Sequence, residues 1–155
     1  MPTSQDTPAG PAAADVARAL LTTSSEAVVA ADRDGVITVW NPGAERLFGH
    51  PVEEAVGSTL DLIVPERLRA AHWRGYREVM RTGRSRYGPG DVLAVPGVRR
   101  GGATVSLEFT VTPLQDPGGR PAGIVAVLRD VTARFEELRA LRRQLAAPGR
   151  AAGGS

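Results

Sequence analysis

Two histidines, His50 and His72, are the residues best suited to bind a metal, because the chain contains no cysteine. His72 lies in an expected helix over residues 65–83, one turn before Tyr76 and two turns before Met80. An imidazole on a rigid helix can ligate a metal when it is neutral and projects into a dry cavity. A lone helical histidine more often packs or forms a hydrogen bond, so both interpretations stand at this point.

The other polar residues do not form an arrangement typical of an enzyme. His50 stands in a Gly-His-Pro sequence that must end a helix, and we expect it to be a surface loop residue. Ser106 has no histidine near it in the sequence, and the carboxylate pairs at residues 53–54 and 136–137 lie on expected exposed helix faces. We therefore expect a protein that binds a ligand and has no enzymatic activity.

The composition excludes several classes of site. Without cysteine there is no disulfide, thiolate nucleophile, iron–sulfur cluster or cysteinyl flavin adduct, and without lysine there is no Walker-type phosphate loop or Schiff base. The net charge is +2, but the arginines are interspersed with acids, so no direct nucleic-acid binding is expected. The sequence has no apolar run of about 20 residues and no signal-peptide pattern, which predicts a cytoplasmic protein without a membrane span.

At 155 residues the chain is long enough for one domain, and β-strands dominate its predicted core. Tails at residues 1–12 and 147–155 are rich in Pro, Ala and Gly and are expected to be disordered. An Asp-Gly turn joins the first two strands, and alternation of apolar and polar residues marks the fourth. The expected strands cover residues 27–31, 36–40, 92–98, 104–113 and 122–131.

Helices are expected before, between and after these strands. Asn41 is a suitable N-cap for a short helix that begins at Pro42, and Thr132 is the expected cap of the last helix. The expected helices cover residues 15–21, 42–48, 52–56, 65–83 and 132–145. A narrow apolar seam typical of a short two-stranded coiled coil runs along the last one: Phe135, Leu138, Leu141 and Leu145.

Residue strings in this order resemble the PAS family. The strings are ADRDGVITVWNP at residues 31–42, AERLFG at 44–49, RRGG at 99–102 and GIVAVLRDVT at 123–132. The resemblance implies an α+β fold: a five-stranded antiparallel sheet with short helices on one face and flanking N- and C-terminal helices. It also implies a sensory domain over residues 13–131, followed by a signalling helix over residues 132–146.

The stretch PERLRAAHWRGY at residues 65–76 is similar to the haem-binding PAS subgroup, in which a histidine on the longer helix ligates the iron. The similarity implies that His72 ligates haem b, and that Arg84 and Arg86 pair with the propionates. The whole set of expected cofactor-binding residues is His72, Tyr76, Met80, Arg84, Arg86, Leu93, Val95, Leu107, Phe109, Val125 and Val127.

Leu93 stands where the oxygen-sensing members of that subgroup have an arginine, so an apolar wall is expected on the side opposite the histidine. The resemblance therefore implies a sensor of a diatomic gas (CO, NO or O₂) or of redox state, with CO, NO or redox favoured. Two alternatives stay open: a PAS domain that senses a flavin or an organic acid, and a ligand-free dimerisation or protein-interaction module.

Partners are expected at the ends of the chain. The terminal helices predict a homodimer. We expect the output domain to be a kinase, a cyclase or a transcription regulator, on a separate protein or on a further part of a longer chain.

Overall fold

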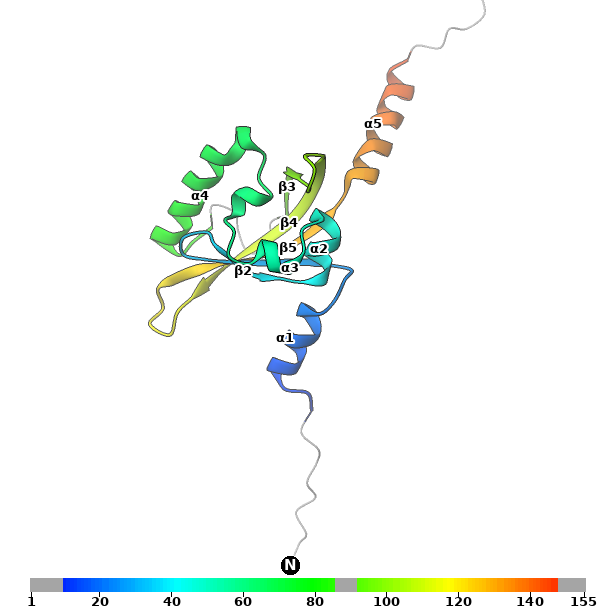
Figure 1. Ribbon diagram of the computed structural model, residues 1–155. Helices are drawn as coiled ribbons and strands as arrows, with labels where there is room; N and C mark the ends of the chain where they lie inside the picture. The colour runs from blue at the N-terminus through cyan, green and yellow to red at the C-terminus, as the bar shows by residue number, and fades with distance from the viewer. Residues whose placement is uncertain (1–9, 86–91, 148–155) are drawn as a thin grey trace, which may run out of the picture.

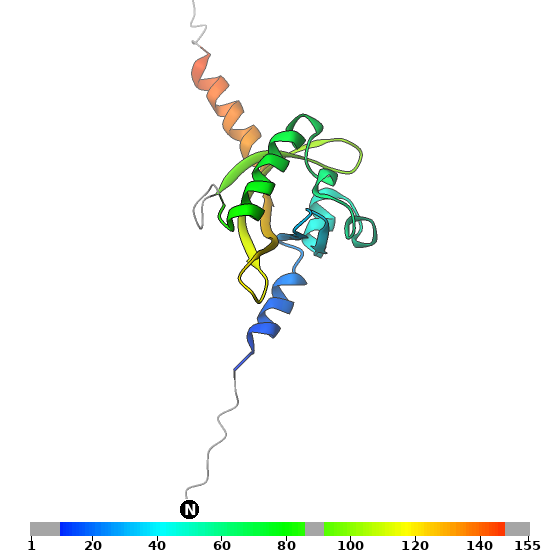
Figure 2. The same ribbon diagram turned by 90° about the vertical axis from the view of Figure 1, so that its left-hand side faces the viewer.

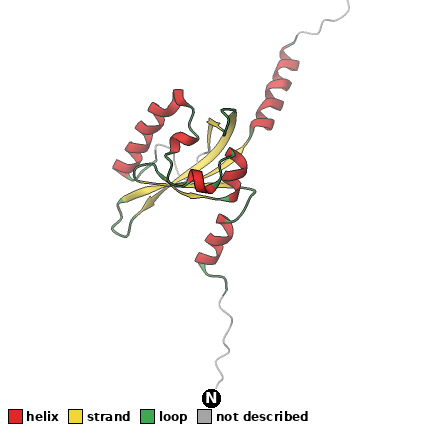
Figure 3. Ribbon diagram, viewed as in Figure 1, coloured by secondary structure: helices red, strands yellow, loops and turns green. Residues whose placement is uncertain are grey.

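Five strands form one antiparallel sheet in the order β2-β1-β5-β4-β3 (Figures 1 and 3). The structure, a computed structural model, describes residues 10–85 and 92–147. The expected disordered tails therefore lie largely outside the described residues. The strands are β1 (Ala27–Asp32), β2 (Ile37–Trp40), β3 (Leu93–Val98), β4 (Thr104–Gln115) and β5 (Pro121–Asp130).

Helices cover the inner face of this sheet, and one further helix stands at each end of the domain. Figure 2 shows α4 crossing over the sheet, while α1 and α5 extend from the body in opposite directions. The predicted α+β architecture is confirmed. The helices are α1 (Ala13–Leu21), α2 (Pro42–Phe48), α3 (Val52–Ala55), α4 (Arg69–Thr82) and α5 (Thr132–Ala146), with 3₁₀ turns η1 (Leu60–Leu62) and η2 (Glu66–Leu68).

Asn41 connects the first hairpin to α2. Its Oδ1 accepts hydrogen bonds from the backbone nitrogens of Ala44 (2.9 Å) and Val28 (2.8 Å). Its Nδ2 donates to the backbone oxygens of Glu26 (2.8 Å) and Thr23 (3.0 Å). The predicted cap is confirmed, and the side chain also satisfies backbone groups of β1 that burial would otherwise leave unpaired.

The long helix begins later than predicted. Pro65 is followed by the 3₁₀ turn η2, in which the Leu68 nitrogen donates to the Pro65 oxygen at 2.8 Å. The regular helix starts at Arg69 and ends at Gly83, whose φ of +70° suits a glycine. A tightened first turn of this kind is common at helix starts and is invisible in the apolar periodicity.

Thr132 does not cap α5, contrary to the sequence expectation. Its hydroxyl accepts a hydrogen bond from the backbone nitrogen of Ser106 at 3.0 Å, and its own backbone nitrogen donates to Asp130 Oδ1 at 2.9 Å. The Val131 nitrogen donates to the Ser106 oxygen at 2.9 Å. The start of α5 is therefore fixed near the beginning of β4.

β3 continues through Pro96, although proline cannot donate a backbone hydrogen bond within a sheet. β3 is an edge strand that pairs only with β4, so the missing N–H of the proline breaks no ladder bond. Among the described helices, none is long and apolar enough to cross a membrane.

Candidate ligand-binding pocket

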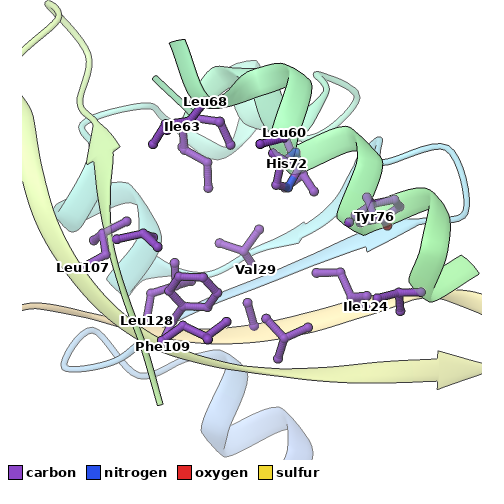
Figure 4. A pocket seen from close by; sticks show the side chains of 18 of the residues that line it. Val29, Leu60, Ile63, Leu68, His72, Tyr76, Leu107, Phe109, Ile124 and Leu128 are labelled. Carbon is purple, nitrogen blue, oxygen red and sulfur yellow. The ribbon is translucent and has the colours of Figure 1, made fainter. Parts of the chain in front are cut away.

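An apolar cavity of about 450 Å³ lies between α4 and the inner face of the sheet (Figure 4). This volume is typical of pockets that hold small ligands. Among the described residues that line it, only His72, Tyr76 and Ser85 have polar side-chain atoms. The lining comprises Val29, Leu60, Ile63, Val64, Leu68, Ala71, His72, Gly75, Tyr76, Val79, Ser85, Leu93, Val95, Pro96, Leu107, Phe109, Val111, Ile124, Ala126 and Leu128.

Strand alternation places most of the expected wall residues in this lining. Leu107 and Phe109 come from β4, and they pair with Val95 and Leu93 of β3. Figure 4 shows His72 on α4 across the cavity from Phe109 and Leu128. The structure therefore brings together the histidine and the expected apolar wall.

Val125 and Val127 do not line the cavity, which corrects the sequence expectation. The neighbouring residues Ile124, Ala126 and Leu128 line it instead, and Val127 is 37% exposed. The register near the β4–β5 turn would have brought the two valines inward. A shift of one residue between Leu114 and Gln115 moves every later side chain of the pairing to the opposite face.

His72 carries a buried polar atom that has no hydrogen-bond partner in the described part of the chain. Among the described residues, its Nδ1 is the single buried side-chain nitrogen or oxygen without a hydrogen-bond partner. Leaving such a group unpaired is costly, and no described residue offsets that cost. Burial lowers the pKa of His72, and the carboxylate of Asp61 opposes this only in part, so the imidazole is neutral at neutral pH.

The neighbours of His72 on α4 are firmly anchored. The Trp73 indole nitrogen donates to Asp61 Oδ1 at 2.8 Å, and the Tyr76 hydroxyl donates to the backbone oxygen of Asp32. Both rings contact the imidazole, with centroids 5.0 Å away for Trp73 and 5.9 Å away for Tyr76. His72 therefore packs against residues whose own polar atoms are hydrogen-bonded, while its Nδ1 has no hydrogen-bond partner among the described residues.

Two further described residues of the predicted cofactor-binding set do not line the cavity. Met80 does not line the cavity, and it is partly buried against the hydrophobic core. Arg84 is exposed just beyond α4 and lines a neighbouring hollow. Arg86 lies outside the described residues.

His50 lies in a loop as expected, but its side chain is more buried than that of a surface residue. Its side chain is 12% exposed, and its ring lies 6.5 Å from the ring of Trp40. The Trp40 indole nitrogen also donates to the His50 backbone oxygen at 3.0 Å. The contact with Trp40 buries the His50 side chain, and nothing in the local Gly-His-Pro sequence indicates this contact.

Sequence reasoning missed the part of the wall that comes from irregular chain. Leu60 and Ile63 lie in or beside η1, and Ser85 follows α4. The segment over residues 57–65 has no regular periodicity, although its apolar residues were visible. Only the apolar composition of this segment could have indicated its place in the wall, because side chains in short turns do not follow a helical or strand periodicity.

The residues present fit one haem. Haem would need one neutral imidazole from the protein, within an apolar cavity. His72 meets this requirement in charge, burial and lack of a competing hydrogen bond.

A family model described as "PAS fold" matches residues 21–136. This chain belongs to the PAS family. Solved PAS structures share the arrangement: the PAS domain of a protein from Colwellia psychrerythraea has a TM-score of 0.66 at 20% identity, and covers 78% of this chain and 98% of that one. The predicted family and fold are confirmed.

Curated relatives cover the same region of this PAS domain. "Sensor protein FixL" of Bradyrhizobium diazoefficiens is 32% identical over 127 residues, which are 78% of this chain and 25% of FixL. "Oxygen sensor protein DosP" of Escherichia coli is 37% identical over 60 residues, 39% of this chain and 7% of DosP. The chain therefore spans a quarter or less of the length of these two relatives.

A structure with a different printed role is similar too. An "RNA-binding Light-Oxygen-Voltage Receptor" has a TM-score of 0.64 at 25% identity, and it covers 96% of this chain and 41% of that one. The PAS fold of this chain is thus shared by proteins with different inputs.

Proposed function

We propose that this PAS domain is a sensor that binds haem b through His72 and responds to a diatomic gas or to redox state. The observation that carries the proposal is the neutral imidazole of His72 in the wall of an otherwise apolar cavity. Bound haem would supply an iron coordination position for a gas and a redox couple. Similarity to proteins named "Sensor protein FixL" and "Oxygen sensor protein DosP" supports the proposal.

The apolar wall sets the expected ligand preference. Leu93, Phe109 and their neighbours exclude water and offer no hydrogen-bond donor to a gas bound in the cavity. Dioxygen gains more than carbon monoxide from such a donor, so the site favours CO or NO over O₂. Leu93→Arg would add a donor, and we expect it to raise the O₂ affinity relative to the CO affinity; an unchanged ratio would contradict this role for the wall.

The terminal helices are the proposed output of the sensor. β4 contributes Leu107 and Phe109 to the cavity, and Ser106, directly before Leu107, holds the start of α5 through two hydrogen bonds. A ligand that displaces β4 therefore moves the base of α5. We infer that α5 pairs with the α5 of a second copy and passes this movement to a kinase, cyclase or transcription regulator.

Flavin is the alternative cofactor, because structures named for Light-Oxygen-Voltage sensing share the fold. The polar edge of a flavin ring requires several convergent hydrogen-bonding groups. Here the Tyr76 hydroxyl is occupied by Asp32, and the described lining is otherwise nearly free of polar side chains. These features favour haem over flavin.

Absorption spectroscopy of purified protein titrated with haemin tests the proposal. We expect a Soret band with wild-type protein, a large loss of haemin affinity in His72→Ala, and wild-type binding in the control His50→Ala. Equal binding by wild type and His72→Ala, or no uptake at all, would overturn it. A bound flavin spectrum, or a colourless dimer that ignores haemin, would instead support the alternative cofactor or the interaction module.

A further inference from the structure

A second hollow adjoins the cavity along the outer side of α4. It is lined by Arg74, Gly75, Glu78, Val79, Thr82, Arg84 and Ser85. Three of these residues, Gly75, Val79 and Ser85, also line the apolar cavity. The two spaces therefore meet at this strip of α4, so that a polar hollow borders one side of an apolar one.

The charges of this hollow are unbalanced. Glu78 is engaged by Arg81, with Arg81 Nη2 at 2.6 Å and Nε at 3.2 Å from its carboxylate oxygens. The guanidinium groups of Arg74 and Arg84 make no ion pair or hydrogen bond with any residue in the described part of the chain. Two exposed guanidinium groups thus line the hollow without a partner among residues 10–85 and 92–147.

Guanidinium groups recognise carboxylates through paired, charge-assisted hydrogen bonds. The backbone at this end of α4 does not provide that attraction itself, because the C-terminus of a helix carries partial negative charge and repels anions. Any anion at this position would therefore be held by the two arginines. The adjoining cavity accepts only an apolar body.

We propose that Arg74 and Arg84 form a carboxylate-binding site at the edge of the cavity, so that the ligand is an apolar molecule with carboxylate groups at one end. The inference rests on the proposed function, since it requires that the cavity holds a ligand. The propionates of haem have this chemistry, and so does the head group of a free fatty acid.

Gly75 leaves room for a ligand to extend from the cavity into the second hollow, because it has no side chain at their junction. A Cβ placed on Gly75 would meet no atom within 4 Å, so this position faces open space although it lies within a helix. Gly75→Leu would place a side chain where the ligand crosses from the cavity to the arginines. The substitution removes a glycine from a helix interior, so it should not destabilise the fold, and lost binding would reflect obstruction.

The test compares haemin with haemin dimethyl ester, whose carboxylates are blocked, in wild type, Arg74→Gln/Arg84→Gln, Gly75→Leu and the control Arg77→Gln. Arg77 is exposed on α4 and lines neither hollow. We expect wild type and the control to bind haemin about tenfold tighter than the ester, the scale of one charged hydrogen bond. The arginine double variant should lose this preference, and Gly75→Leu should weaken both ligands.

Retention of the preference in the double variant would overturn the inference while leaving haem binding through His72 intact. If wild type takes up no haemin, the proposed function fails, and palmitate with its methyl ester replaces the haemin pair. A preference for palmitate that disappears in the double variant would then uphold the carboxylate site. Equal binding of the acid and the ester, or binding of neither, would overturn it.

Discussion

The hydroxyl of Tyr76 on α4 donates a hydrogen bond to the backbone oxygen of Asp32 at the end of β1. Burial, with the nearby carboxylates of Asp32 and Asp34, raises the pKa of Tyr76 to about 12, so the hydroxyl keeps its proton. This bond ties the helix that carries His72 to the first hairpin. The position of the imidazole therefore depends on a residue one turn further along α4.

Tyr76→Phe removes this bond and keeps the ring against His72. We expect the free energy of unfolding to fall by about 1 kcal/mol, because the Asp32 carbonyl loses the Tyr76 donor and keeps the Gly35 nitrogen. Chemical denaturation measures the change, and an unaltered m-value would show that the unfolded state is comparable. No loss of stability would mean that the bond does not anchor α4.

The first hairpin turn is also pressed against α4. Gly35 has a φ of +76°, and a Cβ there would lie 2.3 Å from the Trp73 ring. Gly101 has a φ of +90° with no atom within 4 Å of the same position. Gly35→Ala should therefore destabilise the protein more than Gly101→Ala, since both suffer backbone strain and only the first displaces Trp73. Equal losses in thermal or chemical unfolding would refute the contact.

Much of the fold follows from local signals in the sequence. The Asp-Gly turn, the Asn41 cap and the alternation along β4 each report on neighbours within a few residues, and the structure confirms them. The family resemblance added the single five-stranded antiparallel sheet, which the structure confirms. These signals were sufficient for the architecture and for the central placement of His72 on the helix over the cavity.

The orientation of β5 was not available locally. Residues 124–128 are all apolar, as expected of a strand with neighbours on both sides, so no alternation marks an inner face. The face is decided by the register shift at Leu114 and Gln115. Likewise, the burial of His50 depends on Trp40, and the hollow beside Arg74 depends on where α4 meets the chain that follows it. Such features arise from packing between distant segments.

Stability without ligand should depend on the protonation of His72. Burial lowers its pKa below the ordinary value of 6.5, so His72 binds a proton less readily in the folded protein than in the unfolded chain. The unfolded chain therefore binds more protons as the pH falls below about 6.5, and the free energy of unfolding decreases in that window.

His50 contributes with the same sign, because burial lowers its pKa as well. The comparison of wild type with His72→Leu separates the two: the variant should lose less stability than wild type between about pH 7 and about pH 5. Identical slopes for the two proteins would show that His72 is not desolvated in the fold.

The apolar seam of α5 has no partner within the described chain. Leu138 is 45% exposed and Leu141 is 54% exposed. If two copies pair through this seam, Leu138→Glu should shift the protein from dimer to monomer in sedimentation equilibrium. Ala140→Glu adds the same charge on another face of α5 and should leave the dimer intact. A wild-type protein that stays monomeric at high concentration, with and without haemin, would exclude this pairing.

Chemical rescue tests most directly whether the imidazole of His72 is the ligand of the iron. His72→Gly should take up haemin weakly and with an altered Soret band, and added free imidazole should restore the wild-type spectrum by occupying the space left by the side chain. His50→Gly should behave as wild type without imidazole. If His72→Gly binds haemin with wild-type affinity and spectrum before imidazole is added, His72 does not hold the iron and the haem assignment is wrong.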